Sequence, residues 1–413
     1  MLVKCVAVSA LLCVDSRLSS NLAMVLSECV EFASSVVQSI YAIVKAVLIL
    51  VYDSPTPRAS TSTAVQGIGL QTPLPAKLPS VVDIKKALPK QCFERRVKTS
   101  LYYAVRDVVQ VVITFAVFYS LINLTSSTLL RATLVVLYWA VQGTFFTAVF
   151  VIGHDCGHGS FSDYPLLNNV VGTLMHGFLW CPYYMWKLTH RCHHKHTANI
   201  DKDEVFYPVR ESEPCADDKL YVPGFGFGLG WFRYLLLGYN PRPVNHFNPC
   251  HSMFVGHVVG CTCSLGCLAL MTYVLYQFYA VCGLASLVIY YVVPDFIFAS
   301  YVVILTFLHH SEMNLPWYSD TEWDFVRGQL STVDRHYGIV HNVIHSISTH
   351  QMHHMFSLIP HYRLELATKH FRAAFPELVR TCDEPILPSF VRMYLKYDKQ
   401  SVIADDTKVH YYK

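Results

Sequence analysis

The stretch His190-Arg-Cys-His193-His194 carries three imidazoles at relative positions i, i+3 and i+4. On a helix these positions share one face, so the three rings can converge on a single point. The same spacing returns at His350-Gln-Met-His353-His354, and His154 and His158 form an i, i+4 pair upstream. Chance could supply one such pair, but three clusters at helical spacing in one chain indicate metal binding.

The composition favours an integral membrane protein. Of the 413 residues, 53% are hydrophobic and only 15% are charged, whereas about a quarter of a soluble domain is charged. The net charge of +3 is too small to indicate nucleic-acid binding. The fourteen cysteines follow no regular framework. Cys156 and Cys192 lie within the histidine clusters but off the histidine face, so we expect reduced side chains that pack rather than bind metal.

Four apolar stretches predict membrane spans, and a fifth predicts a helix at the membrane surface. The link after residue 124 is short enough to make a hairpin of the first two spans. Pro294 and Asp295 interrupt the last span, where a proline is tolerated with a kink. The buried acid has either a function or a hydrogen-bond partner on a neighbouring helix. The spans are residues 108–124, 129–152, 253–279 and 281–308, and the surface helix, rich in interfacial aromatics, is 166–186.

An even number of crossings separates the first two histidine clusters from the third, so all three end on one side of the membrane. Lysine and arginine gather in residues 187–250, which makes this side cytosolic. Residues 1–53 form an apolar extension that holds either an extra helix or a signal segment. Residues 54–80, rich in Pro, Ser and Thr, predict a linker. Gly224–Gly230 lacks a dinucleotide-binding pattern and predicts a flexible turn.

The eight cluster histidines exceed the four ligands of a tetrahedral zinc site and suit two metal ions. Neutral imidazole binds iron, zinc, copper and nickel. The chain contains no Glu-x-x-His pair and no His-Glu-x-x-His motif. These absences argue against a carboxylate-rich di-iron bundle and against a zinc hydrolase. A histidine-rich metal pair at a membrane edge indicates oxygen activation on an apolar substrate.

The three clusters resemble the histidine boxes of membrane fatty-acyl desaturases, and their surroundings resemble the methyl-end (Δ12 and ω3) subgroup. The resemblance extends over residues 78–397. It is carried by Gly153-His-Asp-Cys-Gly-His-Gly-Ser-Phe161, His190-Arg-Cys-His-His194, Asn199-Ile-Asp-Lys-Asp-Glu204, Asn245-His-Phe-Asn-Pro249, Ser331-Thr-Val-Asp-Arg335, His350-Gln-Met-His-His-Met-Phe356 and Ile359-Pro-His-Tyr362.

The resemblance implies an all-α integral membrane protein, with a four-helix transmembrane stem under a cytosolic helical cap that holds a di-iron site. The desaturase domain would be residues 81–397, followed by a tail, 398–413. A further ligand is implied at the end of the fourth span, where His310 fits best and His309 second, while His345 would support a ligand. The expected metal ligands are His154, His158, His190, His193, His194, His310, His350, His353 and His354.

The implied activity is the O2-dependent insertion of a cis double bond near the methyl end of an unsaturated acyl chain. The resemblance implies two non-haem irons, O2 as co-substrate, and no catalytic group apart from the ligands. A separate cytochrome b5 and its reductase would supply electrons, since no His-Pro-Gly-Gly haem motif is fused to the chain. The implied location is the endoplasmic reticulum membrane.

The sequence leaves several points open. It does not decide between Δ12 and ω3, between an acyl-CoA and a phospholipid substrate, or which oligomeric state forms. A hydroxylase, acetylenase or conjugase could use the same scaffold. A metal transporter is disfavoured because the histidines lie at the ends of spans and beyond them. An inactive relative is disfavoured because all three boxes are intact.

Overall fold

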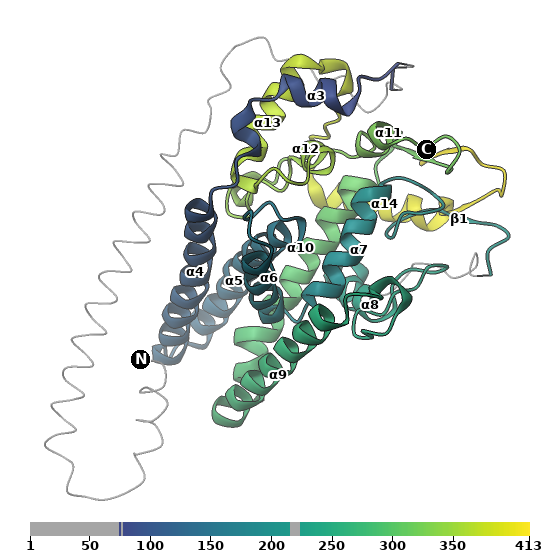
Figure 1. The fold of residues 1–413 in the computed structure, drawn as a ribbon. Coiled ribbons are helices and arrows are strands. Elements are labelled where there is room, and N and C mark those ends of the chain that lie inside the picture. Colours follow the sequence, from purple (N-terminus) through teal and green to yellow (C-terminus); the bar gives the residue numbers. More distant parts are fainter. Residues whose placement is uncertain (1–73, 76, 215–223) are drawn as a thin grey trace, which may run out of the picture. The chain divides into compact units, whose positions relative to one another are not determined.

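The computed structural model describes residues 74–75, 77–214 and 224–413. Our predictions for residues 1–53, and for most of the linker 54–80, lie outside this part of the chain. The described residues are mostly helical (Figure 1). Within them, three helical stretches are long and apolar enough to cross a membrane.

The first two of these stretches are α4 (Val97–Leu124) and α5 (Thr128–His158), which pack against each other as the predicted hairpin. α4 begins earlier than predicted, because residues 97–107 are amphipathic and bury Ser100, Ala104 and Asp107. α5 continues beyond the predicted span to His158 and ends at Gly159, which adopts a left-handed conformation (φ 78°). The first histidine box therefore lies on a regular helix.

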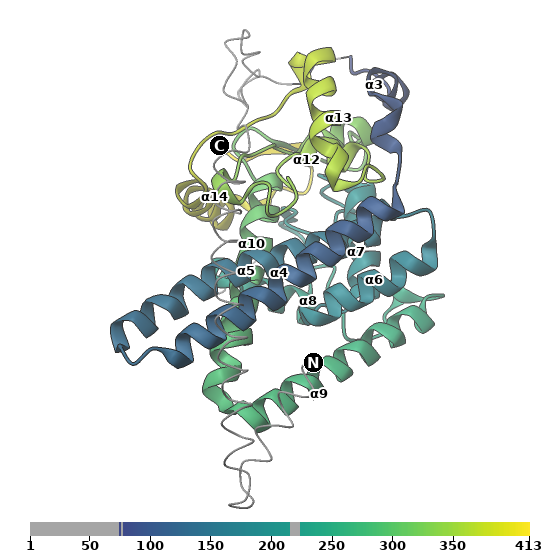
Figure 2. The same cartoon turned by 90° about the vertical axis from the view of Figure 1, so that its left-hand side faces the viewer.

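The third stretch of 53 residues comprises α9 (Val258–Leu287), the π-helical turn η4 (Val288–Val292) and α10 (Val293–His310). Figure 2 shows α9 and α10 meeting at a sharp bend. Near this bend Gly283 has φ 81° and ψ 168°, a conformation open essentially to glycine alone. Gly283 thus marks a kink that was not predicted from the sequence. The wide η4 turn precedes Pro294 and accommodates its missing N–H.

The stretch predicted as one surface helix forms two helices, α6 (Pro165–Phe178) and α7 (Tyr183–His196). The chain breaks between them, where Trp180 has φ 55° and Pro182 caps α7. A proline restricts the residue before it and cannot continue a hydrogen-bonded helix. The break gives the second histidine box a helix with its own direction.

The glycine-rich segment forms a turn, as predicted. A 3-10 turn, η2 (Phe225–Phe227), lies between Gly224 and Gly228, both with positive φ, and leads into α8 (Leu229–Leu237). α8 and η2 both pack on α10. The buried ring of Phe225 joins the largest hydrophobic core cluster.

The remaining elements form a cap around the histidine-bearing ends of α5 and α10. They include two small sheets, so the described fold is not purely α-helical. β1 (Val209–Arg210) pairs with β3 (Val402–Ile403), and β2 (Pro316–Tyr318) pairs with β4 (Val409–Tyr411). Residues 402–411, expected in a tail, thus belong to the fold. The cap helices and turns are α3 (Val81–Ala87), η1 (Lys90–Phe93), η3 (Ser252–Phe254), α11 (Phe325–Gln329), η5 (Gly338–Val340), α12 (His350–Met355), α13 (His361–Ala374), η6 (Pro376–Leu378) and α14 (Ile386–Gln400).

Candidate metal centre

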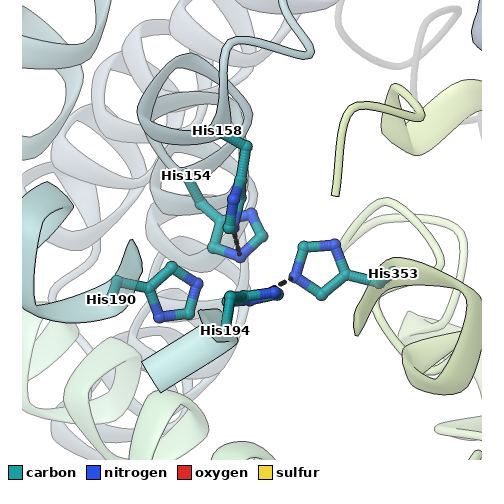
Figure 3. A group of neighbouring side chains, drawn as sticks. All are labelled: His154, His158, His190, His194 and His353. Carbon is teal, nitrogen blue, oxygen red and sulfur yellow. Dashed lines mark hydrogen bonds between the residues drawn. The ribbon is translucent and has the colours of Figure 1, made fainter. Parts of the chain in front are cut away.

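The fold brings the three histidine boxes together. The end of α5, the helix α7 and the cap helix α12 present their histidines toward one another (Figure 3). In the first group, one possible ligand atom from each residue lies within 4.8 Å of the others. Its members are His154, His158, His190, His194 and His353.

A second group lies directly beside the first and contains His193, His310 and His354. His350 belongs with it, since its Nε2 lies 2.9 Å from Nε2 of His310. The rings of His194 and His354 stack at 4.0 Å across the boundary between the groups. α7 and α12 supply histidines to both groups, as expected for neighbouring positions on one helical face.

The spacing of the ring nitrogens fits metal coordination. The Nε2 atoms of His194 and His353 are 3.2 Å apart, as are those of His193 and His310. Two ligands about 2.1 Å from one metal lie about 3.0–3.4 Å from each other. Two neutral imidazoles cannot both accept at this distance without a proton or cation between them. The arrangement therefore matches imidazoles that share a metal.

Burial reinforces this fit. Burial, together with the neighbouring imidazoles, lowers the pKa of His194 and His353 well below the ordinary histidine value. Both rings are thereby kept neutral, the form that binds metal. Nε2 of His190 and Nε2 of His354 are buried and have no hydrogen-bond partner among the described residues. Buried polar atoms without a partner are rare unless a ligand completes them.

The structure separates His310 from its neighbour His309. In His309, Nδ1 contacts the Val333 carbonyl and Nε2 contacts the Tyr337 hydroxyl at 2.7 Å. Both ring nitrogens of His309 are thus committed to the protein. His310 instead directs Nε2 toward His193 and His350. This geometry favours His310, the first choice from the sequence.

The hydrogen bonds and ring contacts of His345 are with residues other than the nine candidate ligands. It forms a hydrogen bond with the carboxylate of Asp107 on α4 and contacts the rings of Tyr103 and His361. These contacts tie the cap to the stem. Cys156 and Cys192 belong to neither group of candidate ligands found in the described residues.

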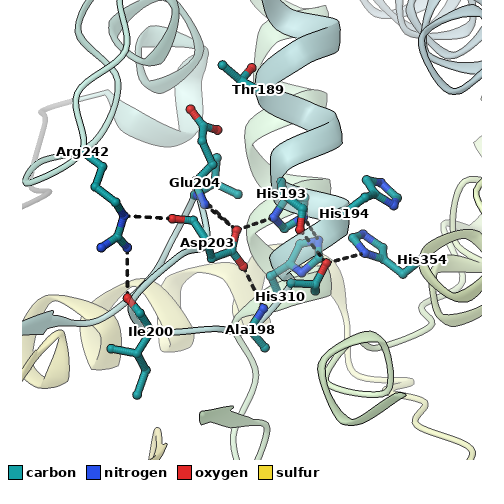
Figure 4. A network of polar contacts seen from close by, with 12 residues as sticks. Thr189, His193, His194, Ala198, Ile200, Asp203, Glu204, Arg242, His310 and His354 are labelled. Atoms are coloured by element: carbon teal, nitrogen blue, oxygen red, sulfur yellow. Dashed lines mark hydrogen bonds and ion pairs between the residues drawn. The ribbon is translucent and has the colours of Figure 1, made fainter. Parts of the chain in front are cut away.

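Sequence reasoning missed Asp203, which orients a candidate ligand (Figure 4). Its fully buried carboxylate lies 2.7 Å from Nδ1 of His193 and accepts the backbone N–H groups of Ala198 and Glu204. The bond fixes the His193 proton on Nδ1 and leaves Nε2 free for metal. Asp203 belongs to the Asn199–Glu204 motif. This motif contributes to the resemblance to desaturases, but its sequence alone does not indicate a chemical role for Asp203.

Other polar side chains hold the histidine helices in place. Thr197 Oγ1 and Gln329 Oε1 lie 3.1 and 3.3 Å from Nδ1 of His354. Asp155, next to His154, accepts hydrogen bonds from the backbone and ring of His361. No short-range pattern reveals these partners, because each comes from a distant part of the chain.

A cavity opens beside the histidines, as is usual for sites that bind small apolar molecules. Its wall is formed largely by apolar and aromatic residues of α5, α8 and α10. Histidines of both groups lie in the same wall. Lining residues include Phe150, Trp186, Trp231, Val302, Val303, His154, His190, His193, His310 and His350.

These features define an integral membrane protein whose histidine-rich candidate metal centre faces an apolar cavity. A family model described as fatty acid desaturase matches residues 131–385. An sn-1 acyl-lipid omega-3 desaturase (ferredoxin) of Nostoc sp. (strain 36) is 38% identical over 325 residues, covering 76% of this chain and 86% of that relative.

Two relatives come from Arabidopsis thaliana. An acyl-lipid omega-3 desaturase (cytochrome b5), endoplasmic reticulum, is 37% identical, and the alignment covers 80% of this chain and 83% of that relative. A Delta(12)-fatty-acid desaturase is 38% identical, and the alignment covers 70% of this chain and 79% of that relative. The chain belongs to the fatty acid desaturase family, in agreement with the resemblance of its histidine boxes. It is therefore an oxidoreductase.

Proposed function

We propose that the protein inserts a cis double bond near the methyl end of an unsaturated acyl chain, as a Δ12 or ω3 desaturase in unsaturated fatty acid biosynthesis. The observation that carries this proposal is the cavity, whose largely apolar wall contains histidines of both candidate metal groups. Relatives named as omega-3 and Delta(12) desaturases support the methyl-end position of the new bond.

Two irons would be held by the two histidine groups. The first site would use His154, His158, His190, His194 and His353, and the second His193, His310, His350 and His354. Bound iron would supply the reduction of O2 and the removal of two hydrogens from adjacent carbons. Asp203 would keep His193 in the tautomer that presents Nε2.

The chain's own residues position the acyl chain. Phe150 on α5 and Val302 and Val303 on α10 belong to rigid helices and form part of the cavity wall. An apolar wall excludes water and holds the acyl chain in one register against the metal centre. A shift of one methylene along this wall changes the product.

We also propose four crossings, one each by α4, α5, α9 and α10, with the histidine boxes on the cytosolic face of the endoplasmic reticulum. The bend at Gly283 supports two crossings within the third apolar stretch. A membrane-impermeant maleimide tests this topology in sealed microsomes. Exposed Cys250 should react from the cytosolic side and Cys282, near the bend, only after the vesicles are opened. Labelling of both from one side would contradict it.

The electron donor would be a separate protein, either cytochrome b5 with its reductase or a ferredoxin. One relative is named for cytochrome b5 and another for ferredoxin. Reconstituting the purified enzyme with each donor distinguishes the two.

Expression in yeast supplied with oleate or linoleate tests the activity, with fatty-acid profiling as the readout. New linoleate would indicate Δ12 activity, and new α-linolenate would indicate ω3 activity. His193→Ala should abolish the product while the protein still inserts into membranes. A hydroxylated product in place of a new double bond would overturn the proposal.

A further inference from the structure

The cavity wall contains two buried polar groups that the desaturation of a plain hydrocarbon chain does not use. They are the carboxyl of Glu204 and the indole N–H of Trp231, which are 3% and 4% exposed. Oε1 of Glu204 and Nε1 of Trp231 have no hydrogen-bond partner in the part of the chain that the structure describes. A buried polar group without a partner costs about 1–3 kcal/mol, so it calls for a ligand.

Both groups contact the same residue. The Tyr234 hydroxyl donates to Oε2 of Glu204 at 2.8 Å, and the rings of Tyr234 and Trp231 lie 5.8 Å apart. Tyr234 in turn reaches Thr189 on α7 at 3.2 Å, and Thr189 contacts His246 at 2.9 Å. This chain of hydrogen bonds engages Oε2 of Glu204 and leaves Oε1 free at the cavity wall.

Glu204 is suited to a neutral ligand. Burial raises its pKa to about 8, so the carboxyl is mostly protonated near neutral pH and can donate or accept a hydrogen bond. Trp231 offers a donor only. A donor and a neutral carboxyl in the wall of one cavity are together complementary to an O–H group, which accepts a hydrogen bond from the donor and exchanges one with the carboxyl. A hydrocarbon chain satisfies neither.

We propose that Glu204 and Trp231 form a hydroxyl-binding subsite in the acyl cavity, through which the enzyme also desaturates acyl chains that carry a mid-chain hydroxyl. This inference rests on the proposed function. The reaction is the same: two hydrogens leave adjacent carbons, one new C=C forms, and the hydroxyl is retained. Burying a hydroxyl in an apolar cavity is unfavourable unless it is hydrogen-bonded, and the subsite offsets that cost.

Competition in yeast microsomes tests the subsite. Microsomes containing the enzyme receive oleate together with octadec-9-enoates whose single hydroxyl is moved one carbon at a time along the chain. Gas chromatography with mass spectrometry then gives the ratio of hydroxylated to plain products. Because the subsite is fixed relative to the histidines, we expect one hydroxyl position to be converted in clear preference to the others.

Variants connect this preference to the two side chains. Trp231→Phe and Glu204→Leu should each lower the hydroxylated-to-plain ratio at that position by about two- to tenfold, the effect of one hydrogen bond. Glu204→Gln keeps a polar group and should retain most of the preference. Trp317→Phe, which alters a buried tryptophan outside the cavity wall, is the matched control and should leave the ratio unchanged. The ratio is internal to one sample, so it does not depend on how much variant folds.

Three outcomes would overturn the inference. The wild-type enzyme could convert oleate but no hydroxylated isomer. Trp231→Phe and Glu204→Leu could lower both products in parallel, which would indicate a packing role or a bound water molecule instead of a site for the acyl hydroxyl. Absence of product from every substrate, with the protein present in the membrane, would overturn the proposed function and this inference together.

Discussion

Replacing Asp203 with asparagine tests whether a buried carboxylate tunes the metal centre. The side chain is fully buried, and it meets Nδ1 of His193 at 2.7 Å and the N–H of Ala198 at 2.8 Å. Asparagine has nearly the same shape and keeps one acceptor oxygen. Asp203→Asn therefore removes the negative charge while disturbing the packing little.

The expected loss follows from the charge. A hydrogen bond to a charged group contributes about 1.5–3 kcal/mol, and loss of such a partner to a metal-bound imidazole weakens metal binding by about 10–100-fold. Because asparagine retains one acceptor, we expect Asp203→Asn to weaken iron binding by about tenfold, or about 1.4 kcal/mol. Asp203→Ala would also strand buried N–H groups, so it should lower the free energy of unfolding by about 1–3 kcal/mol per group.

The assay is iron retention by purified enzyme in detergent against a graded series of chelator concentrations. Asp201→Asn is the matched control, because Asp201 lies in the same loop but pairs with Arg210 and the Asp320 backbone N–H. The reasoning is refuted if Asp203→Asn and Asp201→Asn retain iron as the wild type does. It is also refuted if both lose iron to the same extent.

Three further predictions concern the site and its frame. His310→Gln should lower the iron content of purified protein, whereas His309→Gln should keep the iron and lower the melting temperature, since His309 bonds to Tyr337 and the backbone; equal iron content in both would contradict the ligand assignment. Burial raises the pKa of Glu204 from 4.5 to about 8, so the folded state binds the extra proton and stability falls as pH rises from about 4.5 toward 8, by about 3 kcal/mol at pH 7. Glu204→Gln should flatten this decline in urea unfolding at several pH values, and an unchanged slope would count against a buried neutral acid. Tyr412→Ala should cost about 3–5 kcal/mol of unfolding free energy, because Tyr412, directly after β4, is fully buried. A smaller cost than that of half-buried Tyr411→Ala would show that Tyr412 is not part of the core.

Much of the site could be predicted from local spacing. The histidines of the second box share a face of α7, and those of the third share a face of α12, as the i, i+3, i+4 pattern requires. The ends of the helices could be predicted from the sequence less well. α4 extends into polar sequence because the cap covers its first turns, as shown by the contact of Asp107 with His345. The break between α6 and α7 arises at Pro182, within an otherwise continuous apolar run.

The sequence by itself determined the membrane character, the number of histidines and their helical faces, because hydropathy and spacing are properties of neighbouring residues. The comparisons then placed the chain in the desaturase family that those histidine boxes resemble. Only the tertiary structure decided how the histidines divide into two groups, since each group mixes residues from separate helices. It also decided that Asp203 supports His193, and that Glu204 and Trp231 face the cavity. Such partnerships depend on which distant segments the fold brings together, and short-range sequence patterns carry no record of them.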